Sequence, residues 1–158
     1  MHSPNEFAAR GGWWVVAQVP VLLGAVAVPL RWGAVSFDAA NALQITGAVL
    51  FGLGSLLTLA GLVKLGSSLT PFPRPLTNAQ LRQSGVYGWV RHPVYGGLVI
   101  ASLGWSLSWL SLSGVAFSLL VFLFFDRKSA LEEQHLRGRF SEYAAYAQRV
   151  RKLLPWIY

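Results

Sequence analysis

The chain alternates long apolar stretches with polar segments, and this pattern predicts a membrane protein. The apolar stretches cover residues 13–30, 43–63, 93–110 and 114–131. Each is about 18 residues or longer, enough for a helix to cross a hydrocarbon core of ~30 Å. The last two are separated by a Ser-Leu-Ser-Gly turn at 111–114, so we interpret them as a helical hairpin. We therefore predict about four transmembrane helices in a single domain over residues 1–158.

The two polar segments are of different kinds. Residues 64–92 contain Pro71, Pro73 and Pro75, so they cannot form one helix and are expected to be a long loop, which in a small protein is often functional. After the last span, apolar residues recur at spacings of four and three, which indicates an amphipathic helix on the membrane surface over about 132–152. These positions are Leu136, Phe140, Tyr143, Ala147 and Val150. The predicted fold class is all-α: an integral membrane protein with four transmembrane helices and a C-terminal interfacial helix.

The composition agrees with a lipid environment. The chain is 54% hydrophobic and 12% charged, and the charged fraction is about half that of soluble domains. Its net charge of +7 raises the question of nucleic acid. The basic residues gather beside the apolar spans, however, instead of forming a stripe on a soluble fold. We expect the bilayer as a partner and no nucleic acid.

The basic residues also predict the orientation. With the N-terminus inside, four crossings leave Arg31 as the only one of the 13 Lys and Arg residues outside the cytoplasm, in agreement with the positive-inside rule. The 64–92 loop and both termini are then cytoplasmic. A cleaved signal peptide over 13–30 is the alternative, but Arg10 alone makes a weak positive region and no small-residue cleavage site follows.

The chain has no cysteine, which excludes disulfides, thiolate metal sites and cysteine nucleophiles; we expect no metal. This absence and the small size favour a bacterial inner-membrane protein. Gly47, Gly54 and Gly61 recur every seven residues and give the second span a smooth face for close helix packing. The helix that packs there belongs either to the same chain or, in a homo-oligomer, to a second copy.

Two groups of polar residues should meet at the cytoplasmic face. The first is the segment 85–97, Gly-Val-Tyr-Gly-Trp-Val-Arg-His-Pro-Val-Tyr-Gly-Gly, and the second is the pair Glu132-Glu133. The hairpin between them runs out and back, so its ends come together. Pro93 suits the first turn of a helix, where free N–H groups and the preceding arginine and histidine favour an anion. Carboxylates opposite such a helix end suit a zwitterionic or bipolar ligand.

Further motifs follow the acidic pair: Phe140, Tyr143, Tyr146, Arg149-Val150 and Leu154-Pro155. With the Arg91-to-Gly97 run, this ordered set resembles the isoprenylcysteine carboxyl methyltransferase family, in a wider group that includes the phospholipid methyltransferases. The resemblance covers about residues 64–158. It implies S-adenosylmethionine as methyl donor at the cytoplasmic face, with a carboxylate pair holding its ribose hydroxyls or ammonium group and an aromatic ring facing its sulfonium. The cofactor-binding residues it implies are Tyr87, Gly88, Val90, His92, Tyr95, Gly96, Glu132 and Glu133.

The resemblance also implies a lipophilic acceptor. A carboxylate such as a prenylcysteine-like acid is the acceptor we expect, because the sequence offers few histidines as bases for an amine or thiol. A phospholipid amine and a small lipophilic acid, phenol or thiol remain as alternative acceptors. The expected catalytic residues are Arg91, Arg149 and Glu133. Arg91 or Arg149 would steer and orient an anionic acceptor. Positioning of donor and acceptor should supply much of the rate.

Two other functions remain as alternatives. Membrane reductases of the sterol reductase type, which use NADPH, look similar around the His-Pro-x-Tyr-x-Gly element. They are generally longer, and the tandem glutamates with Tyr143-x-x-Tyr146 fit the methyltransferases better. A non-catalytic membrane lipid-binding protein would keep the apolar spans but needs neither the Arg-His-Pro turn nor the acidic pair.

Overall fold

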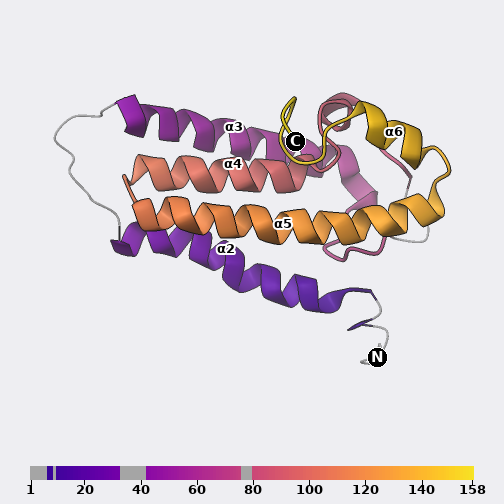
Figure 1. The fold of residues 1–158 in the computed structure, drawn as a ribbon, viewed down its shortest axis with the longest axis horizontal. Coiled ribbons are helices and arrows are strands. Elements are labelled where there is room, and N and C mark those ends of the chain that lie inside the picture. The colour runs from indigo at the N-terminus through magenta and orange to yellow at the C-terminus, as the bar shows by residue number, and fades with distance from the viewer. Residues whose placement is uncertain (1–6, 9, 33–41, 76–79) are drawn as a thin grey trace.

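The computed structural model describes residues 7–8, 10–32, 42–75 and 80–158. Within them the regular secondary structure is helical, apart from an isolated parallel bridge between Val90 and Arg151, so the all-α prediction is confirmed. Four long helices lie side by side (Figure 1): α2 (Gly12–Trp32), α3 (Ala42–Leu65), α4 (Pro93–Ser108) and α5 (Leu112–Arg139). The short elements are η1 (Gly66–Ser68), η2 (Gly85–Gly88) and α6 (Tyr143–Arg149).

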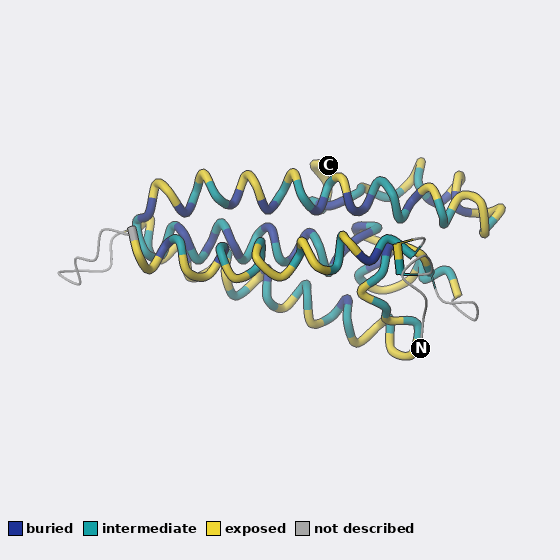
Figure 2. Tube along the Cα trace, turned by 90° about the horizontal axis from the view of Figure 1, so that it is seen from below, coloured by how far each residue is buried: buried dark blue, intermediate teal, exposed yellow. Residues whose placement is uncertain are grey.

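The outer surfaces of α2 and α3 are apolar and exposed, as lipid-facing surfaces are. The segments Gly12–Arg31 and Ala42–Ser68 are long and apolar enough to cross a bilayer, and only 11% of each apolar window is buried. Figure 2 shows exposed positions along the outside of the helices and buried positions where they face one another. Such a surface is unfavourable in water and favourable in lipid. Crossings by α4 and α5, and hence a total of four, stay a prediction.

The glycine face predicted on the second span packs inside the chain. Gly47, Gly54 and Gly61 are the buried residues of α3, and α3 makes its largest contact with α4. A Cβ on Gly47 would lie 2.5 Å from the backbone nitrogen of Ser108. The absence of a side chain therefore lets the two backbones approach closely. The homo-oligomer that the same face also allowed stays a prediction.

The surface helix expected over 132–152 is divided in the structure. Helix α5 does not end at 131 but continues through both glutamates to Arg139, because the change from apolar to polar residues there includes no helix breaker. Phe140 then takes an extended conformation, and α6 covers only Tyr143–Arg149. Glu132 and Glu133 thus stand on a rigid long helix and not at the start of a separate one.

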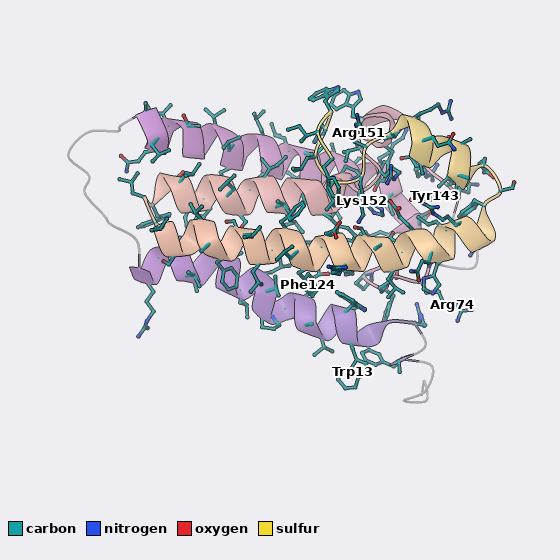
Figure 3. The ribbon with its side chains drawn as sticks, in the orientation of Figure 1. Trp13, Arg74, Phe124, Tyr143, Arg151 and Lys152 are labelled. Atoms are coloured by element: carbon teal, nitrogen blue, oxygen red, sulfur yellow. The ribbon has the colours of Figure 1, made fainter. Side chains whose placement is uncertain are left out.

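The C-terminal segment folds back against the bundle at the end where α4 begins (Figure 1). Asp126 on α5 anchors it, because its carboxylate forms an ion pair with Lys152 and accepts a hydrogen bond of 3.0 Å from the Tyr158 hydroxyl. Figure 3 shows Lys152, Arg151 and Tyr143 together at this end of the bundle. The returning segment lies against the start of α4, beside the polar region described next.

Candidate active site

The first turn of α4 is held in place by the returning C-terminal segment. The backbone N–H of Arg91 donates to the carbonyl of Arg151 at 2.7 Å, and that of His92 donates to the carbonyl of Lys152 at 3.0 Å. Pro93 occupies the first helical turn, as expected. Gly96 is buried, and a Cβ there would overlap the carbonyl oxygen of Leu153. The structure therefore uses Gly96 for the approach of a neighbouring backbone.

The hairpin brings the two polar groups together, and Glu133 is the link between them. Its Oε1 accepts hydrogen bonds from Arg91 Nε at 2.8 Å and from His92 Nε2 at 3.2 Å. Burial opposes ionisation of this carboxyl, but the hydrogen bonds from His92 and Arg91 outweigh it and lower the pKa of Glu133 to about 2. Glu133 is therefore a carboxylate at neutral pH.

Arg91 joins three parts of the chain through one guanidinium group. Besides its bond to Glu133 on α5, it donates to the carbonyl oxygen of Ala147 at 2.9 Å, within α6. It also donates to the carbonyl oxygen of Val150, at the end of that helix. A guanidinium can satisfy several acceptors in one plane. Arg91 thereby fixes α6 against the ends of α4 and α5.

Glu132 faces a different set of partners. Its Oε2 accepts a hydrogen bond of 3.0 Å from the hydroxyl of Tyr95 and lies 3.8 Å from Nδ1 of His92. The Tyr95 ring is stacked between His92 and Phe125, with interplanar angles of 7° and 20°. The Glu132 side chain is 26% exposed, against 9% for Glu133. Its carboxylate is thus a positioned group with capacity left for a ligand.

A cavity of about 320 Å³ opens in front of Glu132, bounded by the start of α4, the C-terminal half of α5, α6 and the loop that follows α3. Its volume lies within the ~300–1,000 Å³ typical of small-molecule sites. The residues from the predicted site that line it are Tyr87, Arg91, His92, Tyr95 and Glu132. Glu133 does not line the cavity but supports two residues that do.

Besides Glu133, three predicted cofactor residues and one predicted catalytic residue stand apart from the cavity. Gly88, Val90 and Gly96 are not in its lining. Val90 is fully buried and forms the bridge to Arg151. Arg149 is exposed, and its Nε donates to the carbonyl of Ala145 one turn earlier at 3.3 Å. The structure thus places Arg149 on the outside of α6.

Several lining residues were not selected from the sequence as binding residues. They are Gln18, Arg82, Lys128, Tyr143 and Tyr146. Lys128 precedes Glu132 by four residues, which is about one helical turn. This spacing could have predicted that both side chains lie on the same face of α5. Gln18 lies in the first apolar span, and a single amide in such a span does not indicate from the sequence that it contacts Lys128. Tyr143 and Tyr146 belonged to the family motif without an assigned role.

Two of these residues present polar atoms with no partner. The hydroxyl of Tyr143 and the Nε of Arg82 are buried, and within the described part of the chain neither has a hydrogen-bond partner. Tyr143 is 1% exposed. Burial and the charge of the Glu133 carboxylate, which lies near the hydroxyl but outside hydrogen-bond geometry, raise the pKa of the Tyr143 hydroxyl, so it is a proton donor at neutral pH. Buried polar groups normally find partners, so an unpaired donor in a cavity wall indicates a place for a ligand acceptor.

The tyrosines also tie the loop to the helices. Tyr146 donates from its hydroxyl to the carbonyl of Tyr87 at 2.6 Å, and the Tyr87 hydroxyl reaches the carbonyl of Gly61 on α3 at 3.4 Å. Burial raises the pKa of Tyr87, and the nearby charge of Glu132 adds to this. Beside the basic side chains of Arg82, Arg91 and Lys128, the cavity wall thus offers neutral phenols, aromatic faces and one accessible carboxylate. The aromatic faces and the carboxylate suit a ligand with a cationic centre.

Comparison with known proteins gives a consistent result. The family model for phospholipid methyltransferases matches residues 43–143. A probable protein-S-isoprenylcysteine O-methyltransferase of rice (Oryza sativa subsp. indica) is 36% identical over 115 residues, which are 70% of this chain and 60% of the relative. The human protein-S-isoprenylcysteine O-methyltransferase is 34% identical over 122 residues, 73% of this chain and 42% of the relative. The chain thus spans about 60% or less of these relatives' lengths.

One solved structure has a similar fold. It is that of the eukaryotic intramembrane Ras methyltransferase, isoprenylcysteine carboxyl methyltransferase, without a monobody. The TM-score is 0.69 at 23% sequence identity, and the match covers 99% of this chain and 55% of the other. At this identity the likeness concerns the fold, which supports an intramembrane arrangement of these helices.

Proposed function

Because the chain belongs to the phospholipid methyltransferase family, we propose that it transfers a methyl group from S-adenosylmethionine to a lipophilic acceptor at the cytoplasmic face of a membrane. The observation that carries the proposal is the cavity of about 320 Å³ with the Glu132 carboxylate, the Tyr95 ring and the unpaired Tyr143 hydroxyl in its wall. The acceptor we propose is a carboxylate such as a prenylcysteine-like acid. The names of the rice and human relatives support this choice.

The cavity residues fit the chemical groups of the cofactor. The aromatic faces of Tyr87 and Tyr95 suit a sulfonium, and Glu132 suits ribose hydroxyls or an ammonium group. The unpaired donors of Tyr143 and Arg82 suit oxygen or nitrogen acceptors. His92 stacks on Tyr95 and keeps that ring in place.

S-adenosylmethionine would supply a methyl group on a positively charged sulfur, and an acceptor carboxylate would need no base, because it has no proton to lose before it accepts the methyl group. The protein is then required mainly to align the two reactants and to exclude water. Glu133 and Arg91 serve this alignment indirectly, because their contacts fix α6 and the end of α5 around the cavity. Arg149 is exposed, so the proposal gives it no contact with the reactants.

The location we propose is a bacterial inner membrane, with both termini in the cytoplasm. Arg74, Arg151 and Lys152 lie at the end of the bundle where α4 begins (Figure 3). Arg31 lies in the last turn of α2, and this helix ends at the opposite end of the bundle (Figure 1). This distribution of charge favours the cavity end as the cytoplasmic one.

The test is calorimetric binding of S-adenosylhomocysteine to the full chain in detergent. The variant Glu132→Gln removes the accessible carboxylate, and Glu142→Gln makes the same change at an exposed site outside the cavity. We expect binding by the wild type and by Glu142→Gln, and binding about tenfold weaker or worse for Glu132→Gln, since a charge-assisted hydrogen bond contributes about 1.5–3 kcal/mol. NADPH should not bind. Binding of NADPH in place of S-adenosylhomocysteine indicates a reductase, and binding of neither by folded protein removes the cofactor from the proposal.

A further inference from the structure

One charged group in the cavity wall, Lys128, is not used by the function proposed above. Lys128 is on α5, is 1% exposed and lines the cavity. Its Nζ donates a hydrogen bond to Oε1 of Gln18 on α2 and lies 5.3 Å from the centre of the Tyr95 ring. A lysine this deeply buried is rare unless an opposite charge compensates it.

Lys128 lacks the carboxylate partner that two nearby basic residues, Arg91 and Lys152, have. Arg91 is paired with Glu133, and Lys152 with Asp126. Within the described part of the chain, no carboxylate oxygen lies within 4.0 Å of Lys128 Nζ. Glu132 is one helical turn away, and its Oε2 already accepts from the Tyr95 hydroxyl. The cavity wall therefore offers an ammonium group whose strongest partner is a neutral amide.

We propose that Lys128, supported by Gln18, binds and orients the carboxylate of the methyl acceptor. The inference rests on the proposed function and deepens it by naming a residue that selects an anionic acceptor head group. A carboxylate that enters the cavity would provide the charge that Lys128 lacks. The amide of Gln18 would hold the ammonium in place, because its oxygen accepts one of the three N–H groups and leaves two for the ligand.

The position of Lys128 favours the acceptor over the carboxylate of the cofactor. Lys128 lies one turn, ~6 Å, deeper along α5 than Glu132, and Gln18 lies six residues, ~9 Å, into α2. Helix α2 has an apolar, exposed outer surface. A lipophilic acceptor would reach this part of the cavity from the bilayer side, whereas a polar cofactor arrives from water at the loop side. The two reactants then meet near Tyr95, which contacts both Glu132 and Lys128.

The test compares an acid with its neutral amide. N-acetyl-S-farnesylcysteine and its carboxamide are titrated into the full chain saturated with S-adenosylhomocysteine, and the ratio of their dissociation constants is measured. We expect the wild type to bind the acid about tenfold more tightly than the amide, and Lys128→Met to reduce this ratio to about one, since the variant loses a charge-assisted contact. Arg127→Met, which removes a charge at the adjacent exposed residue, should keep the wild-type ratio.

Two further variants keep the test decisive if Lys128→Met folds poorly. Lys128→Arg retains the charge and should retain the preference for the acid, and Gln18→Leu removes the supporting amide and should lower the ratio. An unchanged ratio in Gln18→Leu and in a folded Lys128→Met overturns the inference. So does weakened binding of S-adenosylhomocysteine by Lys128→Met with the ratio unchanged at saturation, which assigns Lys128 to the cofactor. If the wild type binds S-adenosylhomocysteine but does not distinguish acid from amide, the inference alone fails. If it does not bind S-adenosylhomocysteine, the proposed function fails first.

Discussion

Glu132 and Glu133 are adjacent on one helix, yet their carboxylates have separate environments. Glu133 accepts hydrogen bonds from Arg91 and His92 and lies outside the cavity lining, whereas Glu132 bonds to Tyr95 and lines the cavity. Successive residues of an α-helix are about 100° apart around its axis, which accounts for the division. One carboxylate therefore holds the fold of the site together and the other is available to a ligand.

This division predicts a difference between matched variants. Glu133→Gln leaves Arg91 and His92 buried without their shared carboxylate, so it should lower the free energy of unfolding by about 3 kcal/mol. Glu132→Gln should lower it much less, because its side chain is more exposed and Tyr95 can still donate to an amide oxygen. Thermal unfolding in detergent measures both. Equal losses in the two variants would contradict the assignment of separate roles.

The lowered pKa of Glu133 predicts how stability depends on pH. Its value of about 2 lies below the ordinary value of 4.5, so the unfolded chain binds a proton at a higher pH than the folded one. The stabilisation is therefore complete above about pH 5 and is lost as the pH falls from 4.5 toward 2. The unfolding midpoint of the wild type should fall over this range. Glu133→Gln lacks the titrating group and should show a flatter curve, while Glu142→Gln should follow the wild type.

Much of the fold was predictable from the sequence, because hydrophobic length and positive charge act locally along the chain. The first two spans and the helix beginning at Pro93 begin and end within two residues of their predicted bounds. The end of α5 was not predicted, because a change from apolar to polar residues ends a membrane span but not a helix. Hydrogen bonding continues until Phe140 leaves the helical conformation.

The candidate site was predictable only in part. The meeting of the Arg-His-Pro turn with the acidic pair followed from the hairpin, and the structure brings Arg91 and Glu133 together. The contact between Lys128 and Gln18 joins residues 110 positions apart. Such a contact depends on the packing of α2 against α5, which no local pattern specifies. Gly96 was read as a place for a ligand because a sequence does not reveal which neighbour occupies the space it leaves.

Gly96 supplies a prediction about the returning C-terminal segment around Leu153. In Gly96→Ala the new methyl group would overlap the carbonyl of Leu153, so the returning segment must move away from α4. The variant should lose stability and bind S-adenosylhomocysteine more weakly, since Arg91 depends on carbonyls near that segment. Gly52→Ala is the matched control, because nothing lies within 4 Å of its Cβ position and alanine favours a helix by about 1 kcal/mol. It should be neutral or stabilising. A destabilised control would show that the loss in Gly96→Ala comes from replacing a helical glycine and not from Leu153.

The unpaired hydroxyl of Tyr143 gives the sharpest separation of binding from stability. Tyr143→Phe removes a buried donor that has no partner in the described structure, so the free protein should be as stable as the wild type or slightly more so. If the bound ligand accepts from this hydroxyl, its affinity should fall about fivefold to tenfold, as expected for a loss of about 1 kcal/mol. Tyr146→Phe is the counterpart, because its hydroxyl already donates to the carbonyl of Tyr87. That variant should lose stability even without ligand. Unfolding and calorimetric titration of both variants measure the contrast, and a Tyr143→Phe protein with unchanged affinity would show that the ligand leaves this hydroxyl unused.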